Sequence, residues 1–171
     1  ATPLGLRDRA ILEVFYSCAI RNGELRALEL GDVDLSRLQL RVRHGKGGRP
    51  RIVPLGEPAA AWVEEYLKNA RAQLLGKREH GILFVTYRGG PFTKSGHLSD
   101  IVAAYAVAAK LGKHVTPHTI RHCCATHMLA RKAGLRHLQE LLGHATPSST
   151  QIYTRVELSD LKEAHRLYHP R

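Results

Sequence analysis

Cysteine is scarce in this sequence, aromatic residues are few, and no long apolar run occurs. Cys18, Cys123 and Cys124 are the only cysteines in 171 residues, and adjacent cysteines rarely pair with each other, so a disulfide framework is excluded. No apolar stretch approaches the roughly 20 residues that a membrane-spanning helix needs, and the first residues lack the pattern of a signal peptide. Free thiols are typical of a reducing compartment, so we expect a cytoplasmic protein.

Acidic residues are also scarce relative to basic ones. The sequence has 26 Lys and Arg against 15 Asp and Glu, which gives a net charge of +11 and a pI near 10.0 before any of the 11 His is protonated. A charge of this sign and size indicates a polyanionic partner, most commonly nucleic acid. An acidic membrane surface is disfavoured, because no helical segment sets a basic face opposite a face of Trp, Phe and Leu.

The length of 171 residues fits one compact domain, and the hydrophobic periodicity predicts a mostly α-helical α+β fold. We expect helices over residues 6–19, 58–75, 94–110, 135–142 and 159–168, and shorter helices around residues 25–28, from residue 117 onward and over residues 148–151. Residues 31–34 form an expected turn, residues 38–42 and 51–55 an antiparallel hairpin, and residues 82–85 a short buried strand. Tyr66 and Tyr105 fall on apolar stripes, so we expect both in the core.

The stretch from Thr116 to Arg155 holds most of the candidate functional side chains. Thr116 followed by Pro117 is a helix start signal, and it places His118 and Arg121 on one face near the N-terminus of the helix, where an anion is favoured. Gly143 ends the next helix, so His144 follows it in a turn. Tyr153 lies in a polar setting that does not suggest a core residue.

Two chemistries fit these side chains, and the first uses a metal ion. His118 and His122 are four residues apart, as are Cys123 and His127, so either pair could chelate zinc. No third ligand stands at a recognisable spacing, and no Glu follows His118 as a hydrolase of the HExxH type requires. Cys123, Cys124 and Met128 are better interpreted as core residues. We therefore expect neither a metal nor any other cofactor.

The second chemistry is phosphoryl transfer without a metal. Displacement at a phosphodiester builds negative charge on the non-bridging oxygens, and arginine is the residue best suited to stabilise that charge. Arg21 and Arg121 supply two such groups, Tyr153 supplies a nucleophile, and Lys46 in the glycine-rich hairpin loop supplies a proton donor. The alternatives are that Arg21 forms a surface ion pair with Glu24 and that the loop is a solvated charged turn, since it lacks the spacing of a Walker motif.

The segments AIRNGEL, HGKGGRPRIVPL, PHTIRHCCATHML, LLGHA and STQIYTR, in this order, resemble the motifs of the tyrosine recombinase (phage integrase) family. The likeness is greatest to the Xer-type and phage integrase catalytic domains. It implies the catalytic-domain fold of that family, with a small antiparallel hairpin sheet. It also implies that residues 1–171 are the C-terminal catalytic domain of a recombinase whose N-terminal DNA-clamping domain is absent from this chain.

The resemblance further implies a role for each matching residue. Tyr153 matches the nucleophile that forms a 3′-phosphotyrosyl bond with DNA, without metal or ATP. Arg21 and Arg121 match the pair that clamps the scissile phosphate, and Lys46 matches the general acid. His118 matches the histidine that assists proton transfer, His144 the residue that packs or hydrogen-bonds at the phosphate, and Glu24 the acidic partner that orients the first arginine. Asn22, Gly23 and Arg155 depart from the residues commonest in the family.

The partners implied by the resemblance are double-stranded DNA and further copies of the protein, as a tetramer on paired DNA sites held through the C-terminal helix. The protein would then be associated with the nucleoid of a prokaryotic cell. Arg41, Arg43, Arg49 and Lys94 are candidates for DNA binding. Two alternatives stay open: nicking and closing of DNA as by a type IB topoisomerase, and a basic DNA-binding module without chemistry.

Overall fold

The computed structural model describes residues 2–43, 50–143 and 158–170, and this part of the chain is mostly helical with one small sheet. The helices are α1 (Pro3–Cys18), α2 (Asn22–Arg26), the 3-10 helix η1 (Leu30–Asp32), α3 (Glu57–Tyr66), the π-helical η3 (Leu67–Arg71), α4 (Ala72–Leu75), α5 (Ser95–Ala108), α6 (Pro117–Ala130), α7 (Leu135–Leu142) and α8 (Leu158–Tyr168). The strands are β1 (Val33–Asp34), β2 (Gln39–Val42) and β3 (Arg51–Pro54). The predicted α+β fold class is confirmed.

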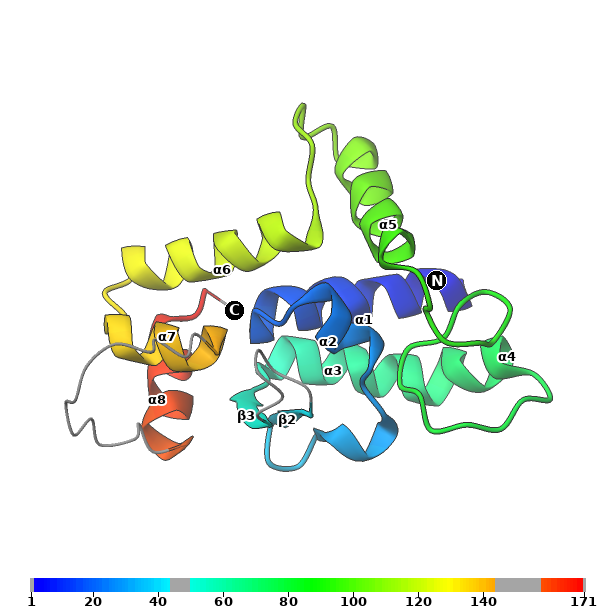
Figure 1. The fold of residues 1–171 in the computed structure, drawn as a ribbon, viewed down its shortest axis with the longest axis horizontal. Helices are drawn as coiled ribbons and strands as arrows, with labels where there is room; N and C mark the ends of the chain where they lie inside the picture. The colour runs from blue at the N-terminus through cyan, green and yellow to red at the C-terminus, as the bar shows by residue number, and fades with distance from the viewer. Residues whose placement is uncertain (1, 44–49, 144–157, 171) are drawn as a thin grey trace.

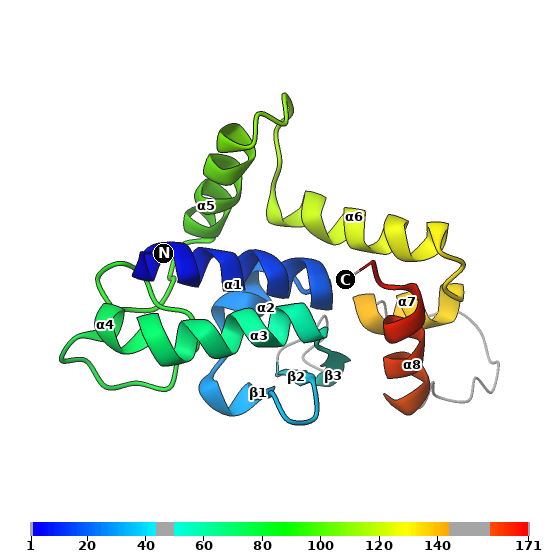
Figure 2. The same ribbon diagram turned by 180° about the vertical axis from the view of Figure 1, so that it is seen from behind.

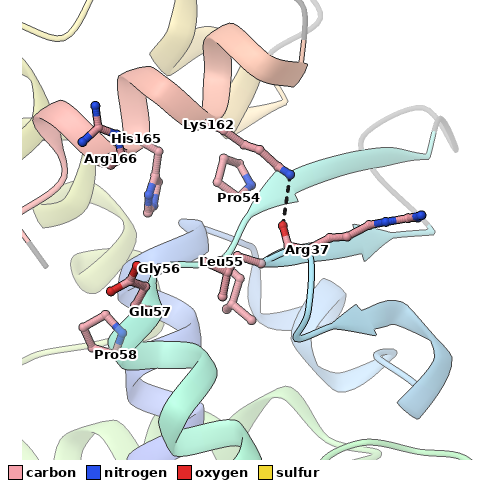
Figure 3. Close-up of a pocket in the computed structure, with 10 residues that line it drawn as sticks. Arg37, Pro54, Leu55, Gly56, Glu57, Pro58, Lys162, His165 and Arg166 are labelled. Carbon is pink, nitrogen blue, oxygen red and sulfur yellow. Dashed lines mark hydrogen bonds between the residues drawn. The ribbon is translucent and has the colours of Figure 1, made fainter.

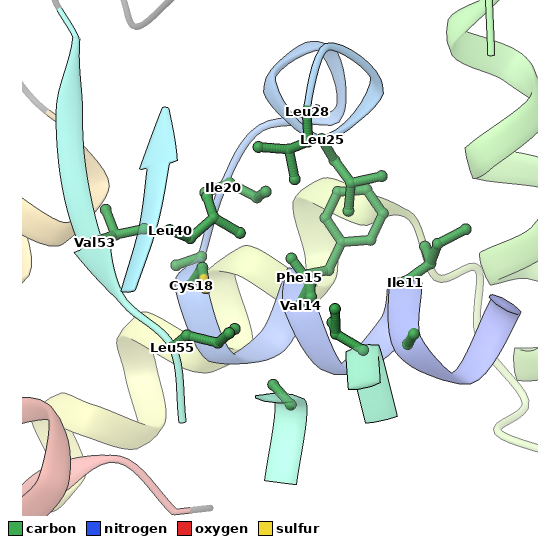
Figure 4. Packing of buried hydrophobic residues seen from close by; sticks show 14 of the residues in the cluster. Ile11, Val14, Phe15, Cys18, Ile20, Leu25, Leu28, Leu40, Val53 and Leu55 are labelled. Carbon is green, nitrogen blue, oxygen red and sulfur yellow. The ribbon is translucent and has the colours of Figure 1, made fainter. Parts of the chain in front are cut away.

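Helix α1 is the central element, packed between α3 and α6 (Figure 1). Its apolar residues Ile11, Val14 and Phe15 recur at helical spacing and are fully buried (Figure 4). The helix begins at Pro3, earlier than predicted, because the Thr2 hydroxyl accepts a hydrogen bond from the Gly5 amide and Pro3 needs no amide partner at the first position.

The three strands form an antiparallel sheet in the order β1-β2-β3. Leu40 pairs with Val53 and Val42 pairs with Arg51, and the buried Leu40, Val42 and Val53 confirm the predicted alternation of the hairpin. The predicted turn over residues 31–34 is wrong in part. Residues 30–32 form η1, and Val33 and Asp34 add a third strand, because Val33 pairs with Leu40.

The predicted strand over residues 82–85 is also wrong. Ile82 and Val85 form only isolated bridges, to Glu29 and Pro91, although Leu83, Phe84 and Val85 are buried. Side chains take the place of a neighbouring strand: Arg71 donates to the carbonyl oxygens of Ile82 and Leu83, and the Tyr66 hydroxyl donates to that of Leu83 at 3.0 Å. Together with the hydrogen bond from the Leu83 amide to the Leu28 carbonyl, these contacts hold the segment without a strand ladder.

Tyr66 is fully buried, as predicted, but Tyr105 is 40% exposed, so the prediction of a core position for Tyr105 is wrong. Helix α5 stands out from the body of the molecule in both views (Figures 1 and 2). Only part of its surface is covered, through residues such as Leu98 and Val102, and the Tyr105 hydroxyl donates to Asp8 at 3.3 Å. A helix with so few partners leaves part of its apolar stripe in solvent.

Helices α7 and α8 begin and end close to the predicted residues, and α6 begins at Pro117 as predicted but is 14 residues long and not short. The Thr116 hydroxyl caps α6 by accepting from the Thr119 amide, and α7 ends at Gly143, whose φ of 60° is left-handed. Helix α8 packs on α6, α7 and β3 of the same chain, with Leu161, Ala164 and His165 buried and Tyr168 partly buried. None of the helices in the described ranges is long and apolar enough to cross a membrane.

The end of α1 is held by two histidines at the C-terminal end of the chain. His165 Nε2 donates to the carbonyl of Ser17 at 2.8 Å, and His169 Nε2 donates to that of Tyr16 at 3.1 Å. The two imidazole rings stack with their centroids 4.3 Å apart and an interplanar angle of 14°. These contacts fix α8 on the last turn of α1, whose carbonyls have no partner within the helix.

Candidate active site

Arg21 occupies the turn between α1 and α2, where it is the residue that precedes α2. Its amide donates to Glu24 Oε2 at 2.7 Å, and its guanidinium Nη1 donates to Glu24 Oε1 at 2.9 Å. The side chain of Glu24 is only 4% exposed, whereas that of Arg21 is 33% exposed. The pair is thus not the surface ion pair considered as an alternative, because its carboxylate is buried and its arginine side chain is only one-third exposed.

A second arginine, Arg51 of β3, binds the same carboxylate. Its Nη1 lies 2.8 Å from Glu24 Oε1 and its Nη2 lies 3.0 Å from Glu24 Oε2, so the pair is bidentate. Burial alone would raise the pKa of Glu24, but the hydrogen bonds from Arg51 and Arg21 outweigh it and lower that pKa below its ordinary value. Glu24 is therefore a carboxylate held between two guanidinium groups. Arg51 was not predicted as a site residue from the sequence.

Arg121 lies on the buried face of α6 and points toward the same region. Its Nη1 donates to the carbonyl of Ala19 and its Nη2 to that of Leu142 at 2.6 Å. Arg21 Nη2 reaches the same Leu142 oxygen at 3.5 Å, so the two arginines that the sequence singled out share one acceptor. Burial, and next the charge of Arg21, lower the pKa of Arg121 to about 10, which still leaves it positive at neutral pH.

The charges of this cluster do not cancel. Three guanidinium groups, those of Arg21, Arg51 and Arg121, are gathered around the single carboxylate of Glu24. Such an excess of fixed positive charge favours binding of an anion, and planar guanidinium groups suit the oxygens of a phosphate. The arrangement can therefore stabilise negative charge that develops during displacement at phosphorus.

His118 lies in the first turn of α6, three residues before Arg121, and its side chain is exposed. The spacing places both on one side of the helix. Lys46, Arg49, His144 and Tyr153 lie outside the described residues. Of the described residues close to these gaps, Arg51 at the start of β3 and Leu142 at the end of α7 both belong to the arginine cluster.

The described candidates for DNA binding differ in their surroundings. Arg41 of β2 and Lys94, before α5, have exposed side chains. Arg43 is instead engaged in two ion pairs, with Asp32 Oδ1 at 2.6 Å and Glu29 Oε2 at 2.8 Å. These acidic partners neutralise the charge that a DNA phosphate would meet at Arg43.

The residues of the metal hypothesis are spread over different surroundings. Cys124 and Met128 are fully buried, as predicted, and Cys123 is partly buried. His122 and His127 are both exposed, and His127 Nδ1 is hydrogen-bonded to the Tyr16 hydroxyl at 2.8 Å. Within residues 2–43, 50–143 and 158–170 no three His, Cys, Asp or Glu side chains are grouped so that they could hold a metal ion.

A cavity of about 490 Å³ lies away from the arginine cluster, between α8 and the segment that joins β3 to α3 (Figure 3). Both apolar and charged residues line it, and on one side Lys162 Nζ donates to the carbonyl of Arg37 at 3.0 Å. The lining residues are Arg37, Leu38, Pro54, Leu55, Gly56, Glu57, Pro58, Lys162, His165 and Arg166. Among the described candidates, Arg21, Glu24, His118 and Arg121 do not line this cavity, so it is distinct from the arginine cluster.

The sequence matches the profile of the phage integrase family over residues 1–159. It is 46% identical to tyrosine recombinase XerD of Pseudomonas aeruginosa over 169 residues, which cover 99% of this chain and 56% of that protein. It is 45% identical to tyrosine recombinase XerC 2 of Ralstonia nicotianae over 170 residues, which cover 99% of this chain and 48% of that protein. The chain thus spans about half the length of the curated relatives it matches.

Solved structures show the same fold. The crystal structure of XerA recombinase is similar with a TM-score of 0.74 and 34% sequence identity, over 97% of this chain and 59% of the other. The XerH site-specific recombinase bound to its difH substrate is similar with a TM-score of 0.71 over 98% of this chain and 44% of the other, but its 22% identity supports a common fold alone. The catalytic-domain fold that the sequence motifs implied is confirmed.

Proposed function

Because this chain belongs to the phage integrase family, we propose that it is the catalytic part of a site-specific DNA recombinase that cuts and rejoins strands through a covalent phosphotyrosyl intermediate. The observation that carries the proposal is the convergence of Arg21 and Arg121 on the Leu142 carbonyl. Both arginines belong to the cluster around Glu24, which has an excess of positive charge. Fixed cations of this kind stabilise the transition state of phosphoryl transfer. Motifs that supply a nucleophile and a proton donor flank the cluster in the sequence.

In the proposed reaction, the Tyr153 phenol attacks the phosphorus of a DNA phosphodiester. The phenol loses its proton with help from His118, the bond from phosphorus to the 5′ oxygen breaks, and Lys46 protonates the departing oxygen. Arg21, Arg121 and His144 bind the non-bridging oxygens of the phosphate. The new phosphotyrosyl ester bond conserves the free energy of the bond that was broken, so a 5′ hydroxyl of another strand can attack the phosphorus, release Tyr153 and form a new phosphodiester without ATP.

A pool of nicked synthetic duplexes with randomised sequence around the nick tests this proposal in the full-length protein. After cleavage, the short strand between the cleaved bond and the nick diffuses away. Its 5′ hydroxyl is then no longer present to reverse the step, so the covalent intermediate accumulates. We expect a denaturant-resistant adduct whose only modified peptide carries Tyr153. The Tyr153→Phe protein is the matched control, and it should bind the same DNA without forming the adduct.

Each alternative function predicts a different outcome of this experiment. A basic DNA-binding module would form no adduct in either protein, which would refute the proposal. A metal-dependent hydrolase would lose its activity to chelators, whereas the proposed reaction is unaffected by them. A topoisomerase-like enzyme would form the adduct but would reseal the same duplex. Transfer of the captured strand to a second, labelled duplex distinguishes recombination from resealing.

We also propose that DNA is the partner that accounts for the net charge of +11, and that the protein acts in the cytoplasm at the nucleoid. The three free cysteines are compatible with a reducing compartment. Arg41 and Lys94 are exposed and suit phosphate binding, as proposed for Arg49 in the hairpin loop. Arg41→Ala should lower the slope of log affinity against log salt by about one, since it removes one phosphate contact. Arg43→Ala should change that slope less, because its charge is already paired with Glu29 and Asp32.

We further propose that this chain works with a separate DNA-clamping domain, and that four copies contact one another through α8 on two paired DNA sites. The length of the relatives supports the first point, and Leu167 supports the second, because this apolar residue of α8 is 50% exposed. Sedimentation of the full-length protein with duplexes should show a complex of four proteins and two DNA molecules, which Leu167→Asp weakens. A complex of one protein per DNA at saturation would contradict the tetramer.

A further inference from the structure

We propose that Arg51 is a positioning residue of the cleavage reaction. Through Glu24 it holds Arg21 in place, and by direct packing it fixes the end of α7 from which His144 follows. This inference rests on the proposed function, because it assigns to Arg51 an effect on the step in which the DNA phosphate is attacked. Arg51 itself does not bind the phosphate in this proposal.

The first observation is the way in which one carboxylate connects two guanidinium groups. Both oxygens of Glu24 accept from Arg51, at 2.8 and 3.0 Å, and the same two oxygens accept from the Arg21 side chain and amide. The Arg51 side chain is 13% exposed and that of Glu24 is 4% exposed, so water does not compete strongly for either. Without Arg51, the buried carboxylate would keep side-chain hydrogen bonds from Arg21 alone among these guanidinium groups, and it would draw the Arg21 guanidinium inward.

The second observation is the contact between Arg51 and Gly143. A Cβ atom on Gly143 would lie 3.0 Å from both Cζ and Nε of Arg51, so the guanidinium rests directly against the backbone of this residue. Gly143 has a φ of 60°, and the adjacent Leu142 carbonyl accepts from Arg21 and Arg121. Arg51 therefore packs at Leu142 and Gly143, the two residues that precede His144. The carbonyl of Leu142 is also the acceptor for Arg21 and Arg121, which bind the phosphate in the proposed function.

The third observation is the position of Arg51 in the chain, which connects the hairpin with α2 and α7. Arg51 opens β3 directly after the loop that carries Lys46, and its register partner Val42 closes β2 before that loop. One rigid guanidinium thereby ties the base of the general-acid hairpin to α2 and α7. A planar fork with fixed donors can hold this geometry, whereas the single ammonium group of a lysine cannot bind both carboxylate oxygens in the same way.

The test compares Arg51→Lys, Glu24→Gln and the double variant in the full-length protein, with DNA selected by wild-type adduct formation from the randomised nicked pool. The measured quantities are the single-turnover rate constant of adduct formation, its amplitude, the affinity for DNA and the melting temperature. We expect Arg51→Lys to lower the rate constant about 10- to 100-fold, since small misplacements of a binding group have effects of this size. DNA affinity should change less than about threefold, because the phosphate contacts themselves remain.

Arg7→Lys is the matched control. Arg7 also forms a buried pair with a carboxylate, that of Asp8 at 2.6 Å, but it lies on α1 away from the cluster. A merely structural loss lowers the amplitude of adduct formation, because fewer molecules are folded, and leaves the rate constant of the folded ones unchanged. We expect that result for Arg7→Lys and a lowered rate constant for Arg51→Lys.

The double variant decides whether Arg51 acts through Glu24. If it does, the double variant reacts within about threefold of the slower single variant, because residues that act as a unit are not additive. A double variant as slow as the product of the two single effects overturns the proposal, and so does a wild-type rate constant for Arg51→Lys. If Arg51→Lys does not fold, the neutral pair Arg51→Gln with Glu24→Gln replaces it: slow cleavage by the folded protein supports the proposal, and wild-type cleavage overturns it.

The same experiment separates this inference from the proposed function. If the wild-type protein forms no adduct with any sequence in the pool, the proposed function fails and the role of Arg51 fails with it. If the wild type forms the adduct and Arg51→Lys forms it equally fast, only the role of Arg51 fails.

Discussion

Arg71 and Arg121 are both buried arginines, 9% and 7% exposed, and both donate to main-chain carbonyl groups. Arg71 binds the carbonyls of His80, Ile82 and Leu83, and these hydrogen bonds hold an irregular segment against the core. Arg121 binds the carbonyls of Ala19 and Leu142, but it shares the second of them with Arg21. The two side chains are thus satisfied by similar acceptors in very different electrostatic surroundings.

The difference shows which feature of a buried arginine indicates function. Hydrogen bonds to carbonyls are expected of any buried guanidinium, because an unpaired one would be costly. The proximity of like charges has no such structural purpose, since Arg21 and Arg51 both disfavour the charged form of Arg121. A folded protein retains this repulsion where an anionic ligand relieves it, and we interpret the site around Arg121 in this way.

The largest expected effect comes from Arg121→Met, which removes the crowded charge but keeps an apolar side chain. Adduct formation should fall by about 10²- to 10³-fold, the typical loss when one transition-state donor is removed. The measurement is the single-turnover rate constant on the trapped DNA, corrected for the folded fraction. A decrease explained entirely by unfolding would show that Arg121 resembles Arg71 and would remove the distinction between them.

Arg71→Met should act on stability instead. It leaves several carbonyl oxygens around His80 and Ile82 without their donor, at a cost of about 3 kcal/mol in the free energy of unfolding. Denaturant unfolding measures this cost. The rate constant of adduct formation by the folded protein should stay within about twofold of wild type, and a much larger change would mean that Arg71 also contributes to the site.

His165 is a third basic side chain bound to a carbonyl, and unlike the two arginines it changes its protonation state within an accessible pH range. Burial, together with the neighbouring His169, lowers the pKa of His165 to about 4 from an ordinary value of 6.5. The folded protein therefore takes up this proton later than the unfolded chain as the pH falls. The stabilisation is complete above about pH 6.5 and is lost progressively toward pH 4, by at most about 1.4 kcal/mol per pH unit. Unfolding titrations of wild type and His165→Gln should differ in this slope, and equal slopes would contradict the assignment.

The smallest effect is expected for Gly143→Ala, which probes the contact with Arg51 by stability alone. Gly112→Ala is the matched control, since Gly112 has a similar φ of 66° and open space where a Cβ would be added. Both substitutions incur the cost of a left-handed residue, about 1 kcal/mol. Gly143→Ala should cost roughly 1 kcal/mol more, because Glu24 holds Arg51 in the way of the new methyl group. Equal costs in denaturant unfolding would show that Arg51 moves freely.

Much of the fold could be predicted from the sequence where local signals and packing agree. The start of α6 at Pro117 and the end of α7 at Gly143 follow from a cap, a proline and a glycine, whose effects are local. Tyr105 was misplaced because periodicity shows which residues share a face but not how much of that face a neighbour covers. Residues 82–85 were misplaced because apolar extended segments resemble strands even when side chains, such as that of Arg71, satisfy their backbone.

The candidate site was predicted in the same uneven way. Motif likeness pointed to Arg21, Glu24 and Arg121, which the structure brings together. Arg51 was missed because a charged residue at the start of a strand is usually exposed. A signal was nonetheless present: alternation places Arg51 on the face of Val53, and that face is buried. A charged residue in such a register needs a buried partner, and Glu24 is the one that it finds.

The end of α1 accepts hydrogen bonds from two parts of the structure, the C-terminal histidines and Arg121 of α6. The carbonyls of Tyr16 and Ser17 receive His169 and His165, and the carbonyl of Ala19, one step further along, receives Arg121. Displacement of α8 from this turn would loosen the backbone to which Arg121 is hydrogen-bonded. If α8 of one copy moved onto another copy in the proposed tetramer, the position of Arg121 in each copy would change through these few main-chain atoms. Amide hydrogen exchange at the residues of this turn would detect the change.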